Sequence, residues 1–471
     1  MANNINIQTI TWELQTQKLA RAKAWQETVS RFSQTELPGL LEAVLAPYNN
    51  DKRHIMIDTV ELDIGNIKNE SELREQLQNA LQRALEKQQR DPQKDEEYSF
   101  LDALKIYLEH GTLPWYADRQ LFGDTALLYV QLTNFTPDQL RSAIKLHHNA
   151  SAIRLIELIG PDQHLISFLQ YLSGTAGDEV LAIATFIRTL IAAAFDSHAP
   201  NNYQTIITFK VLLQYLFANT TLDVKTFLKL WWTDMVKNRY LSLEEQGLLS
   251  QFITGLSRLS FTAISKTSAA QNEQWMDELR VIVGDTPSVP QVAEVKEDKT
   301  IAADISSFFV ENAGCVLLYV YLKKVFTEAG LLGDDLSFIS PELQMQAVRL
   351  LQFIICGHTN FKEYHLVLNK VLCGYDIDAP VIETTDAKLY DIEKANALLQ
   401  VAIANWPKIG HTSVEGLRNS FLLRNGKLVQ ETGNWILYVE RKGMDILMDS
   451  LPYTISVIKL PWMQKALYVQ W

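Results

Sequence analysis

The sequence predicts a mainly α-helical protein with small α+β parts. Apolar residues recur at helical spacing along most of the chain, and strand-like alternation is confined to its two ends. With 471 residues, the chain exceeds one compact domain of usual size. We therefore expect five parts: a small α/β unit (1–89), a linker with one helix and an LPWYA element (90–121), a helical middle region (122–283), a second linker (284–304) and a C-terminal domain of helices plus a small antiparallel sheet (305–471).

The N-terminal unit has a strand–helix–strand–helix pattern. Residues 5–14 have weak strand character, and residues 19–32 follow helical spacing. The segment His54–Gly65, HIMIDTVELDIG, alternates like a strand and changes phase near its centre, which indicates a bulge. Asn69 and Glu72 form a capping-box pattern before a second helix.

Three acidic residues, Asp58, Glu61 and Asp63, lie in the second of these strands. A carboxylate pair for acid–base catalysis is one interpretation. No His, Lys or Gly-rich loop at a fixed spacing accompanies them, so the polar face of a half-buried strand is the preferred interpretation.

The middle region consists of helical pieces separated by polar breaks, and it lacks a sustained heptad or a fixed-period repeat. Charged residues 90–98 precede it, and residues 284–300, with two prolines and no apolar stripe, follow it. Because its helices carry apolar faces that favour packing, we expect the isolated chain to be compact.

The C-terminal domain begins with three predicted helices between Asn312 and Gly374. The second has the clearest borders: Ser340 suits the N-cap, Pro341 the first helical position and Gly357 the C-terminal stop. Two more helices are expected, over residues 391–405 and 413–423. A turn at Asn425–Lys427 and strands within GNWILYVERKG, ISVIKL and ALYVQW then predict the sheet.

One group of residues invites a metal-site interpretation: Cys356, His358, His365 and Cys373. Their spacing matches no zinc-finger or zinc-ribbon pattern, and cysteines near helix ends beside apolar residues behave as small hydrophobes. The chain also lacks a P-loop and the G-x-G-x-x-G, H-E-x-x-H, G-x-S-x-G and paired C-x-x-C motifs. We therefore predict no metal, no cofactor and no catalytic residue.

The composition disfavours several functional classes. The formal net charge of −12 opposes nucleic-acid binding, which needs clustered Lys and Arg. No apolar run reaches the length of a membrane span, and the N-terminus lacks a signal-peptide pattern. Three cysteines suit a reducing cytoplasm better than a disulfide framework.

Several motifs occur in a characteristic order. At the N-terminus these are VELDIG (60–65) and LEHGTLPWYA (108–117). In the C-terminal part they are NAG with LLYVYLKKVFTEAGLL (312–332), QAVRLLQFIICG (346–357), EYHLVLNKVLCG (363–374), NWPKIGHTSVEGLRNSFLLRNGKL (405–428), NWILYVERKGMDILMDSLPY (434–453) and KLPWM…VQW (459–471). This ordered set resembles the tape measure protein family of contractile injection systems, which are phage-tail-like particles. Tyr453 departs from the expected Trp, and the middle region contributes no motif.

The resemblance implies a non-enzymatic structural and assembly protein that sets the length of the inner tube and sheath. It implies inner tube, baseplate or cap proteins as partners. It also allows several copies of this protein in one particle. It also implies a cytoplasmic location during assembly and a place inside the tube afterwards. The alternative is an adaptor or chaperone that docks tube, baseplate or cargo without measuring length.

The resemblance provides no catalytic residues to transfer. It points instead to motif residues that maintain the shared fold or make assembly contacts. For each of them, packing or turn geometry is the simpler explanation. These residues are Asn312, Gly314, Asn369, Lys370, Gly374, Arg418, Pro461 and Trp462.

Overall fold

The computed structural model describes most of the chain. The described residues are 19–45, 62, 64, 65, 67, 69–89, 100–114, 116–146, 148–160, 162–174, 177–194, 202–219, 221–237, 243–255, 269–285, 307–382, 390–410, 412–431 and 433–471. The chain divides into two compact units, residues 1–99 and 100–471. The predicted strands at residues 5–14 and 54–65, with the acids Asp58, Glu61 and Asp63, lie almost wholly outside the described residues, as does most of the second linker.

The first unit contains three described helices: α1 (Leu19–Thr35), α2 (Leu37–Leu45) and α3 (Glu70–Gln89). Their apolar faces form one small core, which includes Phe32, Leu40 and Leu77. The predicted N-cap of α3 is confirmed, because the Asn69 side chain accepts a hydrogen bond from the backbone N–H of Glu72.

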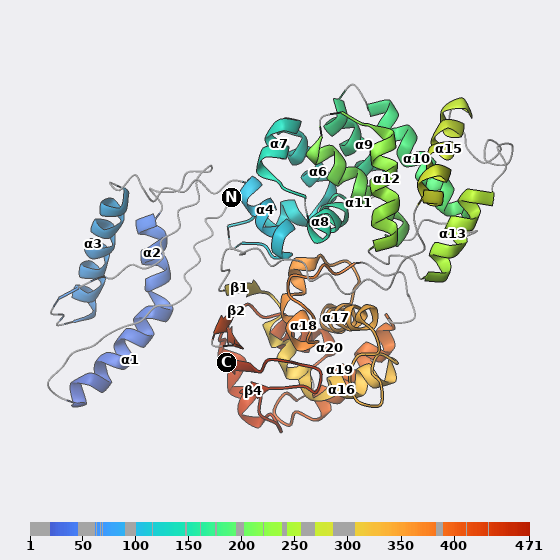
Figure 1. The fold of residues 1–471 in the computed structure, drawn as a ribbon. Helices are drawn as coiled ribbons and strands as arrows, with labels where there is room; N and C mark the ends of the chain where they lie inside the picture. The colour runs from blue at the N-terminus through green and yellow to red at the C-terminus, as the bar shows by residue number, and fades with distance from the viewer. Residues whose placement is uncertain are drawn as a thin grey trace. The chain divides into compact units, whose positions relative to one another are not determined.

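The second unit begins with a segment made of short helices, which we call the helical segment (residues 100–285; Figure 1). Its described helices are α4 (Phe100–His110), α5 (Arg119–Gly123), α6 (Thr125–Thr133), α7 (Pro137–Ala143), α8 (Asn149–Ile159), α9 (Asp162–Ser173), α10 (Gly177–Ala194), α11 (Asn202–Ala218), α12 (Val224–Lys237), α13 (Leu243–Gly255) and α15 (Ala269–Asp285). Most of the helices that are neighbours in sequence pack against one another. A core containing Phe186, Phe209 and Trp231 forms between them, so the segment is folded rather than extended.

The remainder of the unit, the C-terminal segment (residues 307–471), combines helices with a five-stranded sheet (Figure 1). Its helical elements are η3 (Ala313–Leu318), α16 (Tyr319–Glu328), α17 (Pro341–Cys356), η4 (Glu363–His365), α18 (Val367–Leu372), α19 (Ile392–Ala404), α20 (Val414–Leu417), the π-helical turn η6 (Arg418–Leu422) and η7 (Gly443–Ser450). The strands are β1 (Ser307–Val310), β2 (Gly426–Glu431), β3 (Asn434–Val439), β4 (Val457–Ile458) and β5 (Leu467–Gln470).

The structure confirms the predicted fold class and refines the sheet. The strand order is β1-β2-β3-β5-β4, and the pair β3–β5 is parallel while the other pairs are antiparallel. The sheet is therefore mixed. Strand β1 was not predicted, and the expected turn at Asn425–Lys427 is wrong, because Gly426 and Lys427 begin β2.

Local signals explain the best-defined helix, α17. Ser340 Oγ accepts a hydrogen bond from the N–H of Leu343, Pro341 occupies the first turn, and Gly357 ends the helix at φ +79°. Apolar side chains cover most of its circumference, so α17 is the buried central helix of the C-terminal segment. Among the described helices of the whole chain, none is both long and apolar enough to cross a lipid bilayer.

Candidate functional site

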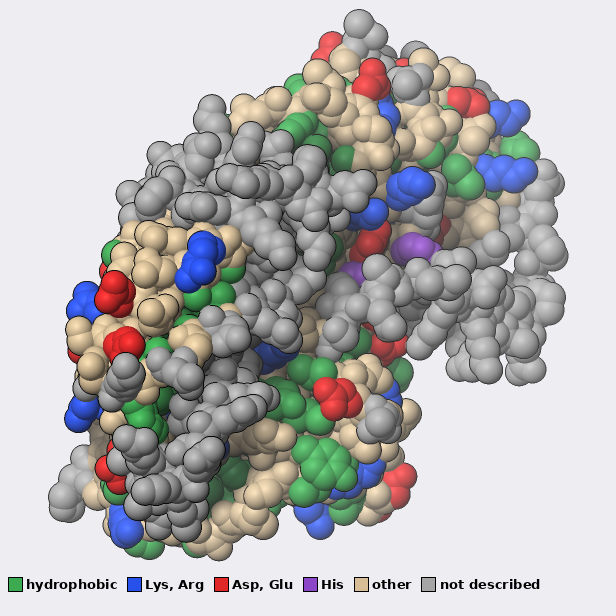
Figure 2. Space-filling model, turned by 90° about the vertical axis from the view of Figure 1, so that its left-hand side faces the viewer, with side chains coloured by type: hydrophobic (Ala, Val, Ile, Leu, Met, Phe, Trp, Pro, Cys, Tyr) green, Lys and Arg blue, Asp and Glu red, His purple; other side chains and the backbone are tan. Residues whose placement is uncertain are grey.

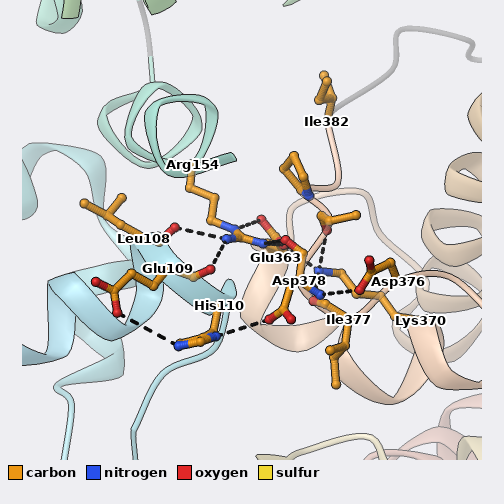
Figure 3. Close-up of polar contacts among 12 residues, drawn as sticks. Leu108, Glu109, His110, Arg154, Glu363, Lys370, Asp376, Ile377, Asp378 and Ile382 are labelled. Carbon is orange, nitrogen blue, oxygen red and sulfur yellow. Dashed lines mark hydrogen bonds and ion pairs between the residues drawn. The ribbon is translucent and has the colours of Figure 1, made fainter. Parts of the chain in front are cut away.

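Five polar side chains meet where the helical segment touches the C-terminal segment (Figure 3). His110 and Arg154 come from α4 and α8, whereas Glu363, Lys370 and Asp378 belong to the C-terminal segment. We call these five residues the interface cluster. Arg154 is fully buried at 0% exposure, and Lys370 at 1% and Glu363 at 8% are nearly so. Buried charges are rare unless they are paired, so three such side chains in one cluster call for an explanation.

Arg154 crosses from one segment to the other. Its Nε lies 3.1 Å from Glu363 Oε2 and its Nη2 lies 3.1 Å from Glu363 Oε1, which is the bidentate arrangement that suits guanidinium and carboxylate. Arg154 Nη1 donates to the carbonyls of Leu108 and Glu109 at the end of α4, at 3.0 and 2.8 Å. Nη2 also donates to the carbonyl of Asp378 at 2.5 Å. The guanidinium thus joins α4, α8 and the C-terminal segment.

Lys370 approaches the same carboxylate from the opposite side. Its Nζ donates to Glu363 Oε1 at 2.5 Å and to the carbonyls of Ile377 and Ala379 at 2.9 and 2.8 Å. Two cations therefore share one carboxylate, and backbone carbonyls accept from the donors that remain. At the edge of the cluster, His110 Nδ1 lies 3.2 Å from Asp378 Oδ1.

The electrostatic shifts follow from this arrangement. Burial alone would raise the pKa of Glu363, but the adjacent Lys370 and Arg154 outweigh it and keep that pKa below its usual range. Burial lowers the pKa of Lys370, although Glu363 opposes this effect. The hydrogen bond from His110 keeps the pKa of Asp378 low.

A second polar contact lies beside the cluster. Arg119 Nη1 of α5 contacts Glu311 Oε1, and Glu311 Oε2 lies 3.7 Å from His365 Nε2. Burial lowers the pKa of His365 to about 4, and the neighbouring Arg119 adds to this effect. The hydrogen bond with the backbone of Lys362 opposes this shift in the pKa of His365. Lys362 Nζ also donates to the carbonyl of Glu157 at 3.3 Å, so polar contacts between the segments recur across this junction.

The motif residues identified in the sequence lie mostly inside the C-terminal segment. Asn312 Nδ2 donates to Gln352 Oε1 and Asn369 Oδ1, both at 2.8 Å, and Asn369 Nδ2 donates to the carbonyl of Val348 at 3.2 Å. This amide group joins η3, α17 and α18. Because Asn312 and Asn369 are at most 2% exposed, their side chains act within the fold.

Two glycines permit close backbone approach. A Cβ on Gly314 would lie 1.6 Å from the carbonyl oxygen of Phe421, in the π-helical turn η6. Gly374 has φ +63°, and a Cβ there would lie 2.6 Å from the carbonyl oxygen of Trp462. Trp462 Nε1 in turn donates to the carbonyl of Leu372 at 2.9 Å, which fixes the loop against α18.

Arg418 and Pro461 complete the set. Buried Arg418 donates to the carbonyl of Ile354 at 3.3 Å, to Asn396 Oδ1 at 3.0 Å and to Glu415 Oε1 at 2.7 Å. Pro461 is exposed at the surface. Of the eight motif residues, only Lys370 belongs to the interface cluster, and an assembly role for any of them stays a prediction.

Sequence reasoning missed Arg154, Glu363, His110 and Asp378. One signal was available for Arg154, which interrupts the apolar run Ala152–Ile156 and therefore needs a buried partner. Nothing local in the sequence identifies that partner, because Glu363 lies 209 residues away.

The Cys and His residues considered for a metal site do not converge. Cys373 is buried, and burial raises the pKa of its thiol well above the usual range. Cys356 Sγ donates to the carbonyl of His358, whereas His365 faces Glu311. Within the described ranges, no group of three or more His, Cys, Asp or Glu side chains has an arrangement that could hold a metal ion.

Charged side chains of both signs occur on the face drawn in Figure 2. On the described part of that face, Lys and Arg side chains and Asp and Glu side chains both occur, scattered among hydrophobic and other groups. This face therefore does not present the continuous basic stripe that phosphate backbones require.

Comparison with known proteins is consistent with the motif order. The family described as contractile injection system tape measure protein matches residues 3–471, including the middle region that contributed no motif. Comparisons with curated proteins and with solved structures give no match. With both terminal parts and the helical segment inside one family match, the chain belongs to the contractile injection system tape measure protein family.

Proposed function

We propose that this protein is a non-enzymatic structural and assembly component that sets the length of the inner tube and sheath of its particle. The observation that carries the proposal is the family match over residues 3–471. The family is structural and implies tube and sheath components as partners. We propose that the C-terminal segment anchors the protein in the particle and that the size of the helical segment determines the length of the tube.

The experiment changes the number of residues before the anchor and measures particle length by electron microscopy. A 40-residue Glu/Ala/Lys-rich helical insertion in the predicted linker, residues 284–304, leaves both folded segments intact. If tube length follows the length of an extended helix, the insertion lengthens the tube by about 60 Å, at about 1.5 Å per residue. The matched control places the same insertion after Trp471, beyond the anchor, where no lengthening is expected.

A second candidate function is supported by one specific observation, the folded core of the helical segment. A folded body suits an adaptor or chaperone that docks tube, baseplate or cargo. For such an adaptor, the linker insertion leaves particle length unchanged, whereas deletion of the C-terminal segment stops assembly. If the insertion leaves particle length unchanged, the length-setting function is rejected and the adaptor function is kept.

A further inference from the structure

We propose that the interface cluster is a releasable contact: it holds the helical segment on the C-terminal segment, and its opening separates the two while each keeps its fold. Both sides of this contact belong to the same chain, so it forms in the isolated protein. Its release therefore does not depend on whether the protein sets tube length.

The packing of the described elements divides at this junction. The extensive contacts between helices and between strands all lie within the helical segment or within the C-terminal segment, and none of these connects a described element of one with a described element of the other. Polar side-chain contacts join the two, chiefly Arg154 with Glu363 and Arg119 with Glu311, together with the edge-to-face pair Tyr107–Tyr364. Buried apolar residues of both segments also belong to one hydrophobic core. Opening this junction breaks few contacts between whole helices or strands, because the extensive ones lie within each segment.

Each side keeps partners for its own charges after separation. Arg154 retains the carbonyls of Leu108 and Glu109, which belong to the helical segment. Glu363 and Lys370 retain each other at 2.5 Å within the C-terminal segment. Separation therefore exposes charged groups that water can solvate, and it leaves no charge buried and unpaired.

Buried ion pairs suit a contact that must open. The attraction between buried charges is largely offset by the loss of their hydration, so such a pair adds little net stability but strongly specifies one geometry. An apolar junction of the same size would favour the closed form more strongly, because opening would expose its surface to water.

The closed geometry also depends on Gly111, at the end of α4. This residue has φ +69°, and a Cβ there would lie 2.3 Å from Glu363 Oε1 and 3.0 Å from Arg154 Nε. Gly111→Ala therefore inserts a steric obstacle into the cluster without removing a charge. It provides a second route to the open form that is independent of Arg154.

The test compares Arg154→Met with Lys210→Met. Lys210 is also a fully buried cation in the helical segment, but its partner Asp234, with oxygens 2.7 and 2.8 Å away, lies in the same segment and far from the junction in sequence. We expect Arg154→Met and Gly111→Ala to raise the radius of gyration in small-angle X-ray scattering and to split thermal unfolding into two transitions, with far-ultraviolet circular dichroism unchanged. Lys210→Met should lower the unfolding temperature without either effect. A single transition and an unchanged radius in both Arg154→Met and Gly111→Ala would overturn the proposal.

A measurement on the unmodified protein makes the test independent of variant folding. If the contact opens on its own, the amides of Gly111 and Leu366 beside the cluster exchange hydrogen on the order of tenfold or more faster than those inside α10 and α17. Exchange of all these amides at one common rate, through global unfolding alone, would contradict a releasable contact.

Discussion

Removing the shared carboxylate is the sharpest test of the charge balance at the interface cluster. Glu363 accepts three hydrogen bonds from two buried cations, from Arg154 Nε and Nη2 at 3.1 Å and from Lys370 Nζ at 2.5 Å. With Glu363 present, the three groups carry one net positive charge; with Glu363→Gln, they carry two, in a site that is almost closed to water. Leaving buried charge uncompensated costs about 3–5 kcal/mol, so we expect a loss of that size in the free energy of unfolding.

The assay is urea denaturation followed by circular dichroism, with Glu415→Gln as the matched control. Glu415 also pairs with a buried arginine, Arg418 at 2.7 Å, but its own side chain is 70% exposed. Its removal should therefore cost no more than about 1 kcal/mol. The double variant Glu363→Gln/Lys370→Met restores one net charge and should recover part of the loss. A loss below about 1 kcal/mol for Glu363→Gln, or a double variant no better than the single one, would refute the charge-balance reasoning.

Three further predictions concern single positions. Gly314→Ala should destabilise the protein by about 3 kcal/mol or more, because its Cβ would lie 1.6 Å from the Phe421 carbonyl oxygen and the backbone must move; equal urea midpoints for variant and parent would contradict this. Gly374→Ala should cost about 1–3 kcal/mol from φ +63° and from the approach to the Trp462 carbonyl, seen as a lower unfolding temperature. The low pKa of His365, about 4, favours the neutral ring in the folded state, so its contribution is complete above pH 6.5 and is lost as the pH falls towards 4. Unfolding free energies measured across this window should fall by about 2–3 kcal/mol more for the parent than for His365→Gln, and parallel curves would reject the assignment.

Features specified by neighbouring residues could be predicted from the sequence. The limits of α17 follow from Ser340, Pro341 and Gly357, since each acts on backbone groups within a few residues. The predicted start of a helix at residue 413 is likewise local, because the Oγ of Ser413 accepts a hydrogen bond from the N–H of Gly416 in α20. Such signals need no knowledge of the tertiary fold.

Features that depend on distant contacts could not be predicted. Gly426 was interpreted as a turn residue, but it serves close packing inside β2, where a Cβ would lie 2.7 Å from Ala313 Cβ and 2.8 Å from the Tyr438 carbonyl oxygen. The parallel pairing of β3 with β5 depends on the path of the chain between Val439 and Leu467, which no local pattern specifies. The interface cluster is the extreme case, because its two halves lie on opposite sides of the second linker.

The folded helical segment also constrains how a tape measure of this sequence can work. Residues 100–285 drawn out as one continuous helix would span about 280 Å. Reaching that form removes side chains such as Phe186, Phe209 and Trp231 from their core, and each contributes about 1.5–3 kcal/mol while it is buried. A handful of such losses equals the net stability of an ordinary domain, about 5–15 kcal/mol, so extension needs a tube lumen that replaces the lost apolar contacts. If the segment instead acts as a folded body, tube length depends on its folded dimensions, and deleting a surface helix changes that length by much less than 1.5 Å per residue removed. The slope of tube length against the number of residues therefore distinguishes the two mechanisms. Only the extended form, which gives the steeper slope, requires the interface cluster to open before the tube is complete.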